Sequence, residues 1–360
     1  MTLIAFQYGY STAQYTLKKN KPVTIVLQSK SVNLQEIEIA ATKTETIQAK
    51  NNTIFLAFEF YDNLIVALVN KGNNYNTIQV LNDDGSIVKE KRAPEGVENM
   101  MTDCFGNIQL FSATQSHQFY YDYQDITYLP PYPIEEFNTK VLPCQCVFGN
   151  YYYFKEVYHR KLKNRYFYIS KNNLFDRKVI TTVMNKSASD AFDKDYGVKY
   201  FLDQRKKGSG YGMSVDEIMA RLEELQENVP LDPDYVFRMT PAESELVKRD
   251  SFLLVIDYSN KLIKRYNFLG KYLKQDTLHL NSIHPRSIVD LDTHKMYFIT
   301  DKKDAFVLYD YNMYENSLRK IPIEGFNFIK NLRCRNGYLY FLDRDLANVN
   351  TYFKIHKHRL

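Results

Sequence analysis

A stretch in the second half of the chain decides the fold. Residues 251–257 read SFLLVID and residues 262–270 read LIKRYNFLG. Each begins with apolar, β-favouring residues and ends in polar turn residues, which is the pattern of two strands joined by a tight turn. With strands expected at 244–248 and 271–278 on either side, the stretch predicts one antiparallel unit of four strands.

The same unit returns along the chain. A strand rich in Tyr, Phe, Ile and Val, a polar turn and a second strand recur, with turn signals such as Asn82-Asp83-Asp84-Gly85. The repeats cover residues 52–92, 100–129, 145–183, 244–278, 287–322 and 328–360. Their spacing of about 40 to 50 residues is typical of propeller blades. A β-sandwich also needs many short strands but does not explain a repeated four-strand unit.

Composition favours the same architecture. The 360 residues are 44% hydrophobic and 15% aromatic, with 30 Tyr, 23 Phe and no Trp. This is enough apolar material for a large core, and broad flat side chains suit blades that pack face to face. We therefore predict an all-β fold, a six-bladed β-propeller over residues 52–360, and expect residues 52–60 to close the ring against the last blade.

The first 45 residues predict a separate element. Short strands are expected at 3–6, 13–17, 23–27 and 34–39, too few for a complete sandwich. The runs LIAFQYGYST (3–12), VTIVL (23–27) and NLQEIEIAA (33–41) resemble the last third of the carboxypeptidase-regulatory-like β-sandwich found at the N-termini of Bacteroidetes surface and periplasmic proteins. The resemblance implies a partial β-sandwich over residues 1–45, with its first strands and an export signal upstream.

The propeller region also resembles a known group. Residues 249–257 and 266–270, with strands ending in Tyr-Asp or Tyr-Asn and a glycine turn, are similar to six-bladed, NHL-like propellers of Bacteroidetes proteins. This resemblance covers residues 53–360, implies the fold, and brings no catalytic residue with it.

Residues 186–243 interrupt the repeats and form the one helical insertion that the sequence predicts. Ser214-Val-Asp-Glu217 is a capping box, and an apolar stripe follows it until Pro230. The helix is either a structural cover or a lid or docking element. Residues 206–212, KKGSGYG, lack the ending of a phosphate-binding loop and are interpreted as a solvated loop.

Charge and hydropathy narrow the function. The 47 basic and 42 acidic residues leave a net charge of +5, with no polybasic arm, so we expect no nucleic-acid partner. The sequence contains no run of about 18 apolar residues, which is the length that a transmembrane helix needs, so no transmembrane segment is predicted. The expected location is periplasmic or associated with the outer membrane if an export signal lies upstream, and cytoplasmic if Met1 is the true start.

Cysteines and histidines offer weak metal motifs. Cys104, Cys144, Cys146 and Cys334 are too scattered for a disulfide scaffold, and we interpret them as small buried apolar residues rather than as a metal site. His356 and His358 would share one side of a strand, as a metal pair or, preferred here, as a solvated strand end. No metal site, cofactor or catalytic residue is therefore predicted.

The predicted site lies where loops enter the innermost strands. A ring of charged residues there could bind an anionic or sugar ligand: Arg249, Asp250, His284, Arg286, Lys330 and Arg333. The alternative is that these are ordinary residues at the start of blades. The leading hypothesis is a non-enzymatic binding or scaffolding propeller with a protein or glycan ligand. The competing one is a hydrolase or lyase of glycans or lactones, using a metal or carboxylates at the channel mouth.

Overall fold

The computed structural model describes part of the chain in detail. The described residues are 2–5, 13–16, 44–47, 53–72, 75–158, 162–192, 240–249, 251–280, 285–290, 292–302, 305–323, 326, 329–343 and 353–360. The chain divides into two compact units, Met1–Lys43 and Thr44–Leu360, and each is considered by itself.

The first unit contains a hairpin. Strands β1 (Thr2–Ala5) and β2 (Ala13–Thr16) pair antiparallel, with Leu3 opposite Tyr15. Two of the four strands expected in this region are thus present. The strands expected at 23–27 and 34–39 lie outside the described residues, and those that are described show no β-sandwich.

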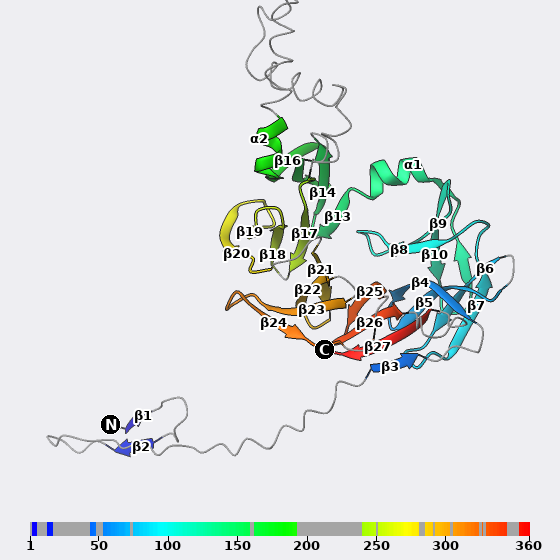
Figure 1. The fold of residues 1–360 in the computed structure, drawn as a ribbon, viewed down its shortest axis with the longest axis horizontal. Helices are drawn as coiled ribbons and strands as arrows, with labels where there is room; N and C mark the ends of the chain where they lie inside the picture. The colour runs from blue at the N-terminus through cyan, green and yellow to red at the C-terminus, as the bar shows by residue number, and fades with distance from the viewer. Residues whose placement is uncertain are drawn as a thin grey trace, which may run out of the picture. The chain divides into compact units, whose positions relative to one another are not determined.

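The second unit is a six-bladed β-propeller whose blades are antiparallel sheets (Figure 1). Blade 1 consists of β4 (Ile54–Tyr61), β5 (Leu64–Asn70), β6 (Asn76–Leu81) and β7 (Ile87–Arg92). Blade 2 consists of β8 (Asn99–Thr102), β9 (Ile108–Phe111), β10 (Gln115–Tyr121) and β11 (Ile126–Tyr128), with the short β12 (Tyr132–Pro133) also paired to β10. Blade 3 consists of β13 (Cys144–Phe148), β14 (Tyr151–Tyr158), β15 (Lys163–Ser170) and β16 (Asn173–Met184).

The second half of the ring follows the same order. Blade 4 consists of β17 (Ser244–Arg249), β18 (Phe252–Asp257), β19 (Leu262–Asn267) and β20 (Tyr272–Thr277). Blade 5 consists of β21 (Arg286–Asp290), β22 (Lys295–Lys302), β23 (Ala305–Asn312) and β24 (Ser317–Ile321). Blade 6 consists of β25 (Lys330–Arg335), β26 (Tyr338–Asp343), β27 (Lys354–Arg359) and β3 (Thr44–Ile47). The prediction of six blades is confirmed.

Strand β18 shows how a blade packs against the blades on both sides of it. All residues from Leu253 to Asp257 are buried, although side chains alternate between the two faces of a sheet. Leu253 and Val255 pack against blade 3, whereas Leu254 and Ile256 pack against blade 5. An unbroken apolar run is needed because both faces of this strand are covered by neighbouring blades.

Ring closure differs from the prediction. Residues 52–60 were expected to join the last blade, but Ile54–Tyr61 is the innermost strand of blade 1. The outer strand of blade 6 is β3, which pairs with β27 so that Ile47 lies opposite Ile355 and Thr44 opposite His358. The C-terminal residues therefore form the third strand of the last blade, and the N-terminal side of the propeller supplies its fourth.

Buried apolar clusters fill five junctions between neighbouring blades. They join blades 1 and 2, 3 and 4, 4 and 5, 5 and 6, and 6 and 1. Within the described residues, no such cluster joins blades 2 and 3. The connection between these two blades contains α1 (Ile134–Glu136) and a π-helical turn, η1 (Phe137–Val141).

The helical insertion is described only at its start and end. Helix α2 (Lys186–Phe192) follows blade 3 directly, and residues 240–243 lead into blade 4. The helix predicted after Ser214 and the loop 206–212 lie outside the described residues.

Candidate functional site

The innermost strands place the predicted site residues around the propeller axis. These strands run in the same direction, because Glu245, the second residue of β17, meets Ser287, the second residue of β21. Their first residues therefore gather at one end of the axis, which we call the amino end. Their last residues gather at the other.

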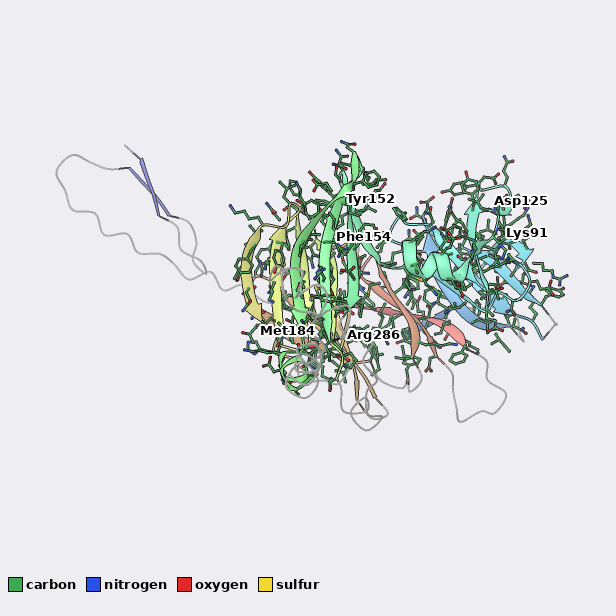
Figure 2. All side chains as sticks on the ribbon, turned by 90° about the horizontal axis from the view of Figure 1, so that it is seen from above. Lys91, Asp125, Tyr152, Phe154, Met184 and Arg286 are labelled. Carbon is green, nitrogen blue, oxygen red and sulfur yellow. A yellow bond between two sulfur atoms is a disulfide. The ribbon has the colours of Figure 1, made fainter. Side chains whose placement is uncertain are left out.

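Four of the six predicted site residues are described, and they do not form one ring. Arg286 and Lys330 are the first residues of the adjacent strands β21 and β25, so both lie at the amino end. Arg286 is labelled in Figure 2. Arg249 is the last residue of β17 and lies at the opposite end. Asp250 and His284 lie outside the described residues.

Arg333 lies between the two ends, in an ion pair. Its Nε donates to Glu59 Oε2 at 2.8 Å, and its Nη2 contacts Glu59 Oε1. Thr102 Oγ1 donates to the same carboxylate at 3.0 Å, so the contact connects blades 6, 1 and 2. Burial alone would lower the pKa of Arg333, but the hydrogen bond and charge of Glu59 raise it. The Glu59 carboxylate thus offsets the positive charge of Arg333.

The two cations at the amino end have a different environment. Both are exposed, and neither forms an ion pair with a carboxylate among the described residues. The ammonium of Lys330 lies 3.8 Å from the ring centroid of Phe353, within the range of a cation–π contact. Burial lowers the pKa of Lys330. The amino end of blades 5 and 6 therefore presents two positive charges, one of which, that of Lys330, lies on an aromatic ring.

Glu245 lies next to this end. Its Oε2 accepts hydrogen bonds from the Ser287 amide at 3.0 Å, the Ser287 hydroxyl at 2.5 Å and the Tyr258 hydroxyl at 2.8 Å. Burial raises the pKa of Glu245, although the hydrogen bonds of Ser287 and Tyr258 and the charge of Lys155 oppose the shift. A carboxyl that keeps its proton more firmly than usual can act as a general acid.

Lys155 of β14 completes this polar group. Its ammonium donates to the carbonyl oxygen of Ser244 at 2.8 Å, and burial lowers its pKa. Asn164 and Tyr166 of β15 bind the hydroxyl of Ser244, each at 2.8 Å. The amino end of blade 4 is thus held by polar contacts from blades 3 and 5.

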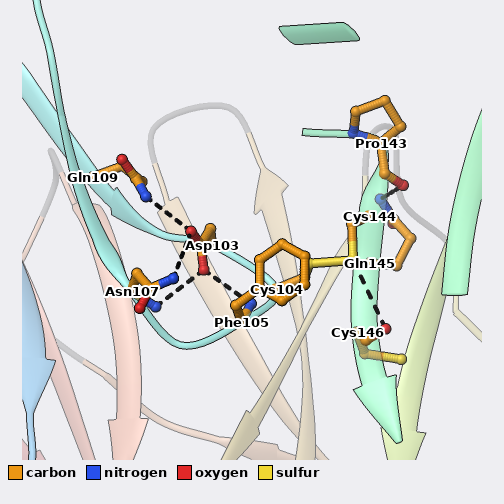
Figure 3. Close-up of a disulfide and its surroundings, with 9 residues drawn as sticks. All are labelled: Asp103, Cys104, Phe105, Asn107, Gln109, Pro143, Cys144, Gln145 and Cys146. Atoms are coloured by element: carbon orange, nitrogen blue, oxygen red, sulfur yellow. Dashed lines mark hydrogen bonds between the residues drawn. A yellow bond between two sulfur atoms is a disulfide. The ribbon is translucent and has the colours of Figure 1, made fainter. Parts of the chain in front are cut away.

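The structure corrects the interpretation of the cysteines. Cys104 and Cys144 form a disulfide, with their Cα atoms 5.8 Å apart (Figure 3). Cys146 and Cys334 are free. Cys104 lies in the turn between β8 and β9, and Cys144 begins β13. Spacing along the chain did not reveal this pair, because 40 residues separate the two cysteines and only the ring brings them together.

The two C-terminal histidines are not at a solvated strand end. Strand β27 is paired on both sides, and His358 is buried. Nδ1 of His358 lies 2.8 Å from Thr44 Oγ1, and Nδ1 of His356 lies 3.3 Å from Thr46 Oγ1. Burial lowers the pKa of both imidazoles. Both histidines contribute to the pairing that closes the ring.

Sequence reasoning missed Glu59 and Glu245. Glu59 interrupts an apolar run in β4, Phe58-Glu59-Phe60, whereas Glu245 lies in β17, SELVKR, which carries several other polar residues. A carboxylate inside an apolar run is costly to bury unless it is paired or hydrogen-bonded, so the interruption was the available signal for Glu59, and β17 offered no such signal for Glu245.

Among the residues that the structure describes, no group of three or more His, Cys, Asp or Glu side chains is arranged to hold a metal ion. No helix in the same set has the length and apolar character to cross a membrane.

Comparison with known proteins assigns no family to the chain. No protein-family model and no curated protein matches the chain. Among solved structures, it is similar to a protein of unknown function from Bacteroides caccae, with 14% identity over 78% of this chain and 84% of that one, at a TM-score of 0.30. The β-propeller domain of the Trilobed protease from Pyrococcus furiosus is 11% identical over 85% and 82% of the two chains, at a TM-score of 0.34. A puromycin-hydrolyzing peptidase from Mycobacterium tuberculosis is 7% identical over 85% of this chain and 50% of its own, at a TM-score of 0.46. These likenesses assign no activity, and the chain is characterised here by its fold, a six-bladed β-propeller.

Proposed function

We propose that this chain is a non-enzymatic binding or scaffolding propeller of an exported bacterial protein, and that it binds an acidic glycan at the amino end of blades 5 and 6. The observation that carries the proposal is the pair Arg286 and Lys330. Both are exposed cations at the starts of adjacent inner strands, whereas Arg333 is already neutralised by Glu59.

The chemistry of this end suits an acidic sugar. A guanidinium presents a planar fork that binds a carboxylate or sulfate through two hydrogen bonds, and an ammonium adds a point charge. The ring of Phe353 beside Lys330 offers an apolar surface to a sugar ring. Charge and an aromatic surface therefore occur together in one place.

Export is proposed because of the disulfide. Disulfides persist mainly in oxidising compartments such as the bacterial periplasm and cell surface. Thiol labelling of the denatured, unreduced protein, recovered from the periplasmic fraction of the bacterial host, should find the two thiols of Cys146 and Cys334. Labelling of all four cysteines in that material would contradict export into an oxidising environment.

Binding is tested with labelled oligosaccharides of sulfated and of uronate-containing chains, compared with neutral chains of equal length. The variant Arg286→Ala/Lys330→Ala should bind the acidic chains at least roughly tenfold more weakly, because each lost charged hydrogen bond contributes about 1.5 to 3 kcal/mol. The control Arg319→Ala/Lys320→Ala removes the same charge from the outer strand β24 and should bind as the wild type does. Equal binding of neutral chains, or equal losses in both variants, would contradict the site.

An enzymatic function is a second candidate, favoured by Glu245. A carboxyl whose pKa is raised by burial is a frequent feature of catalytic sites. In a hydrolase or lyase of glycans or lactones, Glu245 would supply the proton. The variant Glu245→Gln should then abolish turnover while oligosaccharide binding persists. Unchanged turnover in Glu245→Gln would exclude this role.

A further inference from the structure

The junction between blades 2 and 3 is built differently from the other five. Its inner strands β8 and β13 are not in broad contact, in contrast to β4 and β8 or β13 and β17. No buried apolar cluster of the described residues spans the junction. The hydrophobic burial that holds the other blades together is therefore largely missing here.

The face of blade 2 beside this junction is partly polar. Gln109 donates to Asp103 Oδ2 at 2.9 Å, and Ser116 donates to Gln109 Oε1 at 3.1 Å. Apolar side chains also lie on this face: Met101 is opposite Gln109, and Phe111 packs against Phe137 of the connecting segment, with ring centroids 5.0 Å apart. Blade 2 thus satisfies this face with its own hydrogen bonds and with η1, without blade 3.

The face of blade 3 toward blade 2 is aromatic and charged. Tyr152 and Phe154 lie on this side (Figure 2), and Phe154 stacks on Phe167 at 5.3 Å. Arg177 lies over the ring of Phe167 at 3.6 Å and also pairs with Glu156. These groups, too, satisfy one another within blade 3.

Two side-chain contacts between described residues bridge the junction, and one of them is covalent. The ring of Phe105 meets the ring of Tyr152 edge-on, with centroids 5.6 Å apart, and Cys104 is bonded to Cys144. The turn that carries Cys104 is held by Asp103, whose Oδ1 accepts from the amides of Phe105 and Asn107 at 2.9 and 3.0 Å (Figure 3). The disulfide therefore ties a well-defined turn of blade 2 to the first residue of blade 3.

The neighbouring thiol does not compete for this bond. Cys146 lies two residues from Cys144, but burial raises the pKa of its thiol to about 12. Because the thiolate is the species that attacks a disulfide, this shift disfavours attack by Cys146. Cys104 is only partly buried, so an external thiolate has access from its side.

We propose that the Cys104–Cys144 disulfide is a redox latch, and that its reduction lets the ring open between blades 2 and 3 while the other five junctions stay closed. The reductant is a dithiol. Its thiolate attacks one sulfur, the S–S bond breaks, two electrons and two protons convert Cys104 and Cys144 to thiols, and the reductant becomes its own disulfide. The inference does not depend on the ligand proposed above.

Hydrogen exchange of the full chain, without ligand, tests the latch. After reduction with dithiothreitol, peptides covering β8, β9, β13 and β14 should exchange at least roughly tenfold faster, because local opening exposes their amides. Peptides from β4, β5, β26 and β27 should exchange within about twofold of the oxidised protein. Unchanged exchange beside the junction, or equal acceleration in all six blades, would overturn the proposal.

Two variants separate the latch from other effects of the reductant. Cys146→Ser/Cys334→Ser retains only the bonded pair and should respond to dithiothreitol as the wild type does. Cys104→Ser/Cys144→Ser should show the open pattern without reductant and no further response to it. A response in the second variant would assign the effect to other groups and refute the latch; if this variant does not fold, the first variant still decides the question.

Discussion

Two junctions of the ring are held by different kinds of contact: the junction of blade 6 with blade 1, and the junction of blade 2 with blade 3. Where blade 6 meets blade 1, the chain ends are held by strand pairing, a buried apolar cluster around Phe55 and Leu342, and the ion pair of Arg333 with Glu59. Where blade 2 meets blade 3, the chain is continuous, one face is partly polar and the other aromatic and charged, and a disulfide crosses between them. A closed ring therefore does not require the same contact at every junction.

The difference has a physical reason. Closing a ring at the chain ends costs conformational entropy, which only non-covalent contacts can offset at that junction. Between blades 2 and 3, residues 129–143 already limit separation, and a disulfide restricts it further. Apolar side chains are accordingly well buried between blades 6 and 1, and few are buried between blades 2 and 3.

The largest expected effect comes from removing an aromatic ring at each junction. Phe55→Ala should destabilise the protein by about 3 to 5 kcal/mol, because Phe55 is fully buried in the closing cluster and a cavity would remain. Phe105→Ala, its counterpart between blades 2 and 3, should cost less than about 1 kcal/mol, because its ring is 49% exposed. Urea unfolding measures both. Similar losses would show that the two junctions are equally dependent on apolar burial.

A smaller effect is expected from the ion pair at the closing junction. Glu59→Ala should cost about 2 kcal/mol, since it leaves Arg333, whose side chain is 35% exposed, without its carboxylate. Asp310→Ala, whose partner Arg319 is 75% exposed, should change stability by less than about 0.5 kcal/mol. The double variant Glu59→Met/Arg333→Met should recover most of the loss. A double variant as unstable as Glu59→Ala would argue against pairing as the cause.

The smallest expected effect is a pH dependence of closure. Burial lowers the folded-state pKa of His356 and His358 from 6.5, so the unfolded chain takes up protons first as the pH falls. Their contribution to stability is present above pH 6.5 and is lost as the pH falls below it, by at most about 1.4 kcal/mol per pH unit for each histidine.

Thermal unfolding between pH 7 and pH 5 tests this dependence. The variant His358→Gln should have a flatter stability profile than the wild type, whereas His279→Gln, at an exposed position, should follow the wild type. If the stability of His358→Gln changed with pH in parallel with that of the wild type, His358 would not be a cause of the pH dependence.

The blades themselves could be predicted because their signals are local. Apolar runs such as 253–256 and turns such as 82–85 are short-range patterns, and the strands formed within a few residues of the expected bounds. Thr44-Glu-Thr-Ile47 has no such pattern, and of its four side chains only Ile47 is buried. It becomes a strand because β27 offers it an open edge, which no local pattern reveals.

The positions of the candidate residues could be predicted in part, for a related reason. Arg286 and Lys330 begin their inner strands as expected, because blade starts can be located from turns. That Arg249 faces the other end, and that Arg333 is neutralised, depends on strand direction and on Glu59, which is 274 residues away.

The sequence alone determined that this protein is a ring of six aromatic-rich sheets. The signals that specify a blade, which are alternating apolar residues and turn residues, extend over only a few residues. Only the tertiary structure decided which strand closes the ring, which cysteines bond and, among the described residues, that Arg333 pairs with Glu59 whereas Arg286 and Lys330 have no carboxylate partner. These features join residues far apart in the chain, and their partners are chosen by the curvature of the ring.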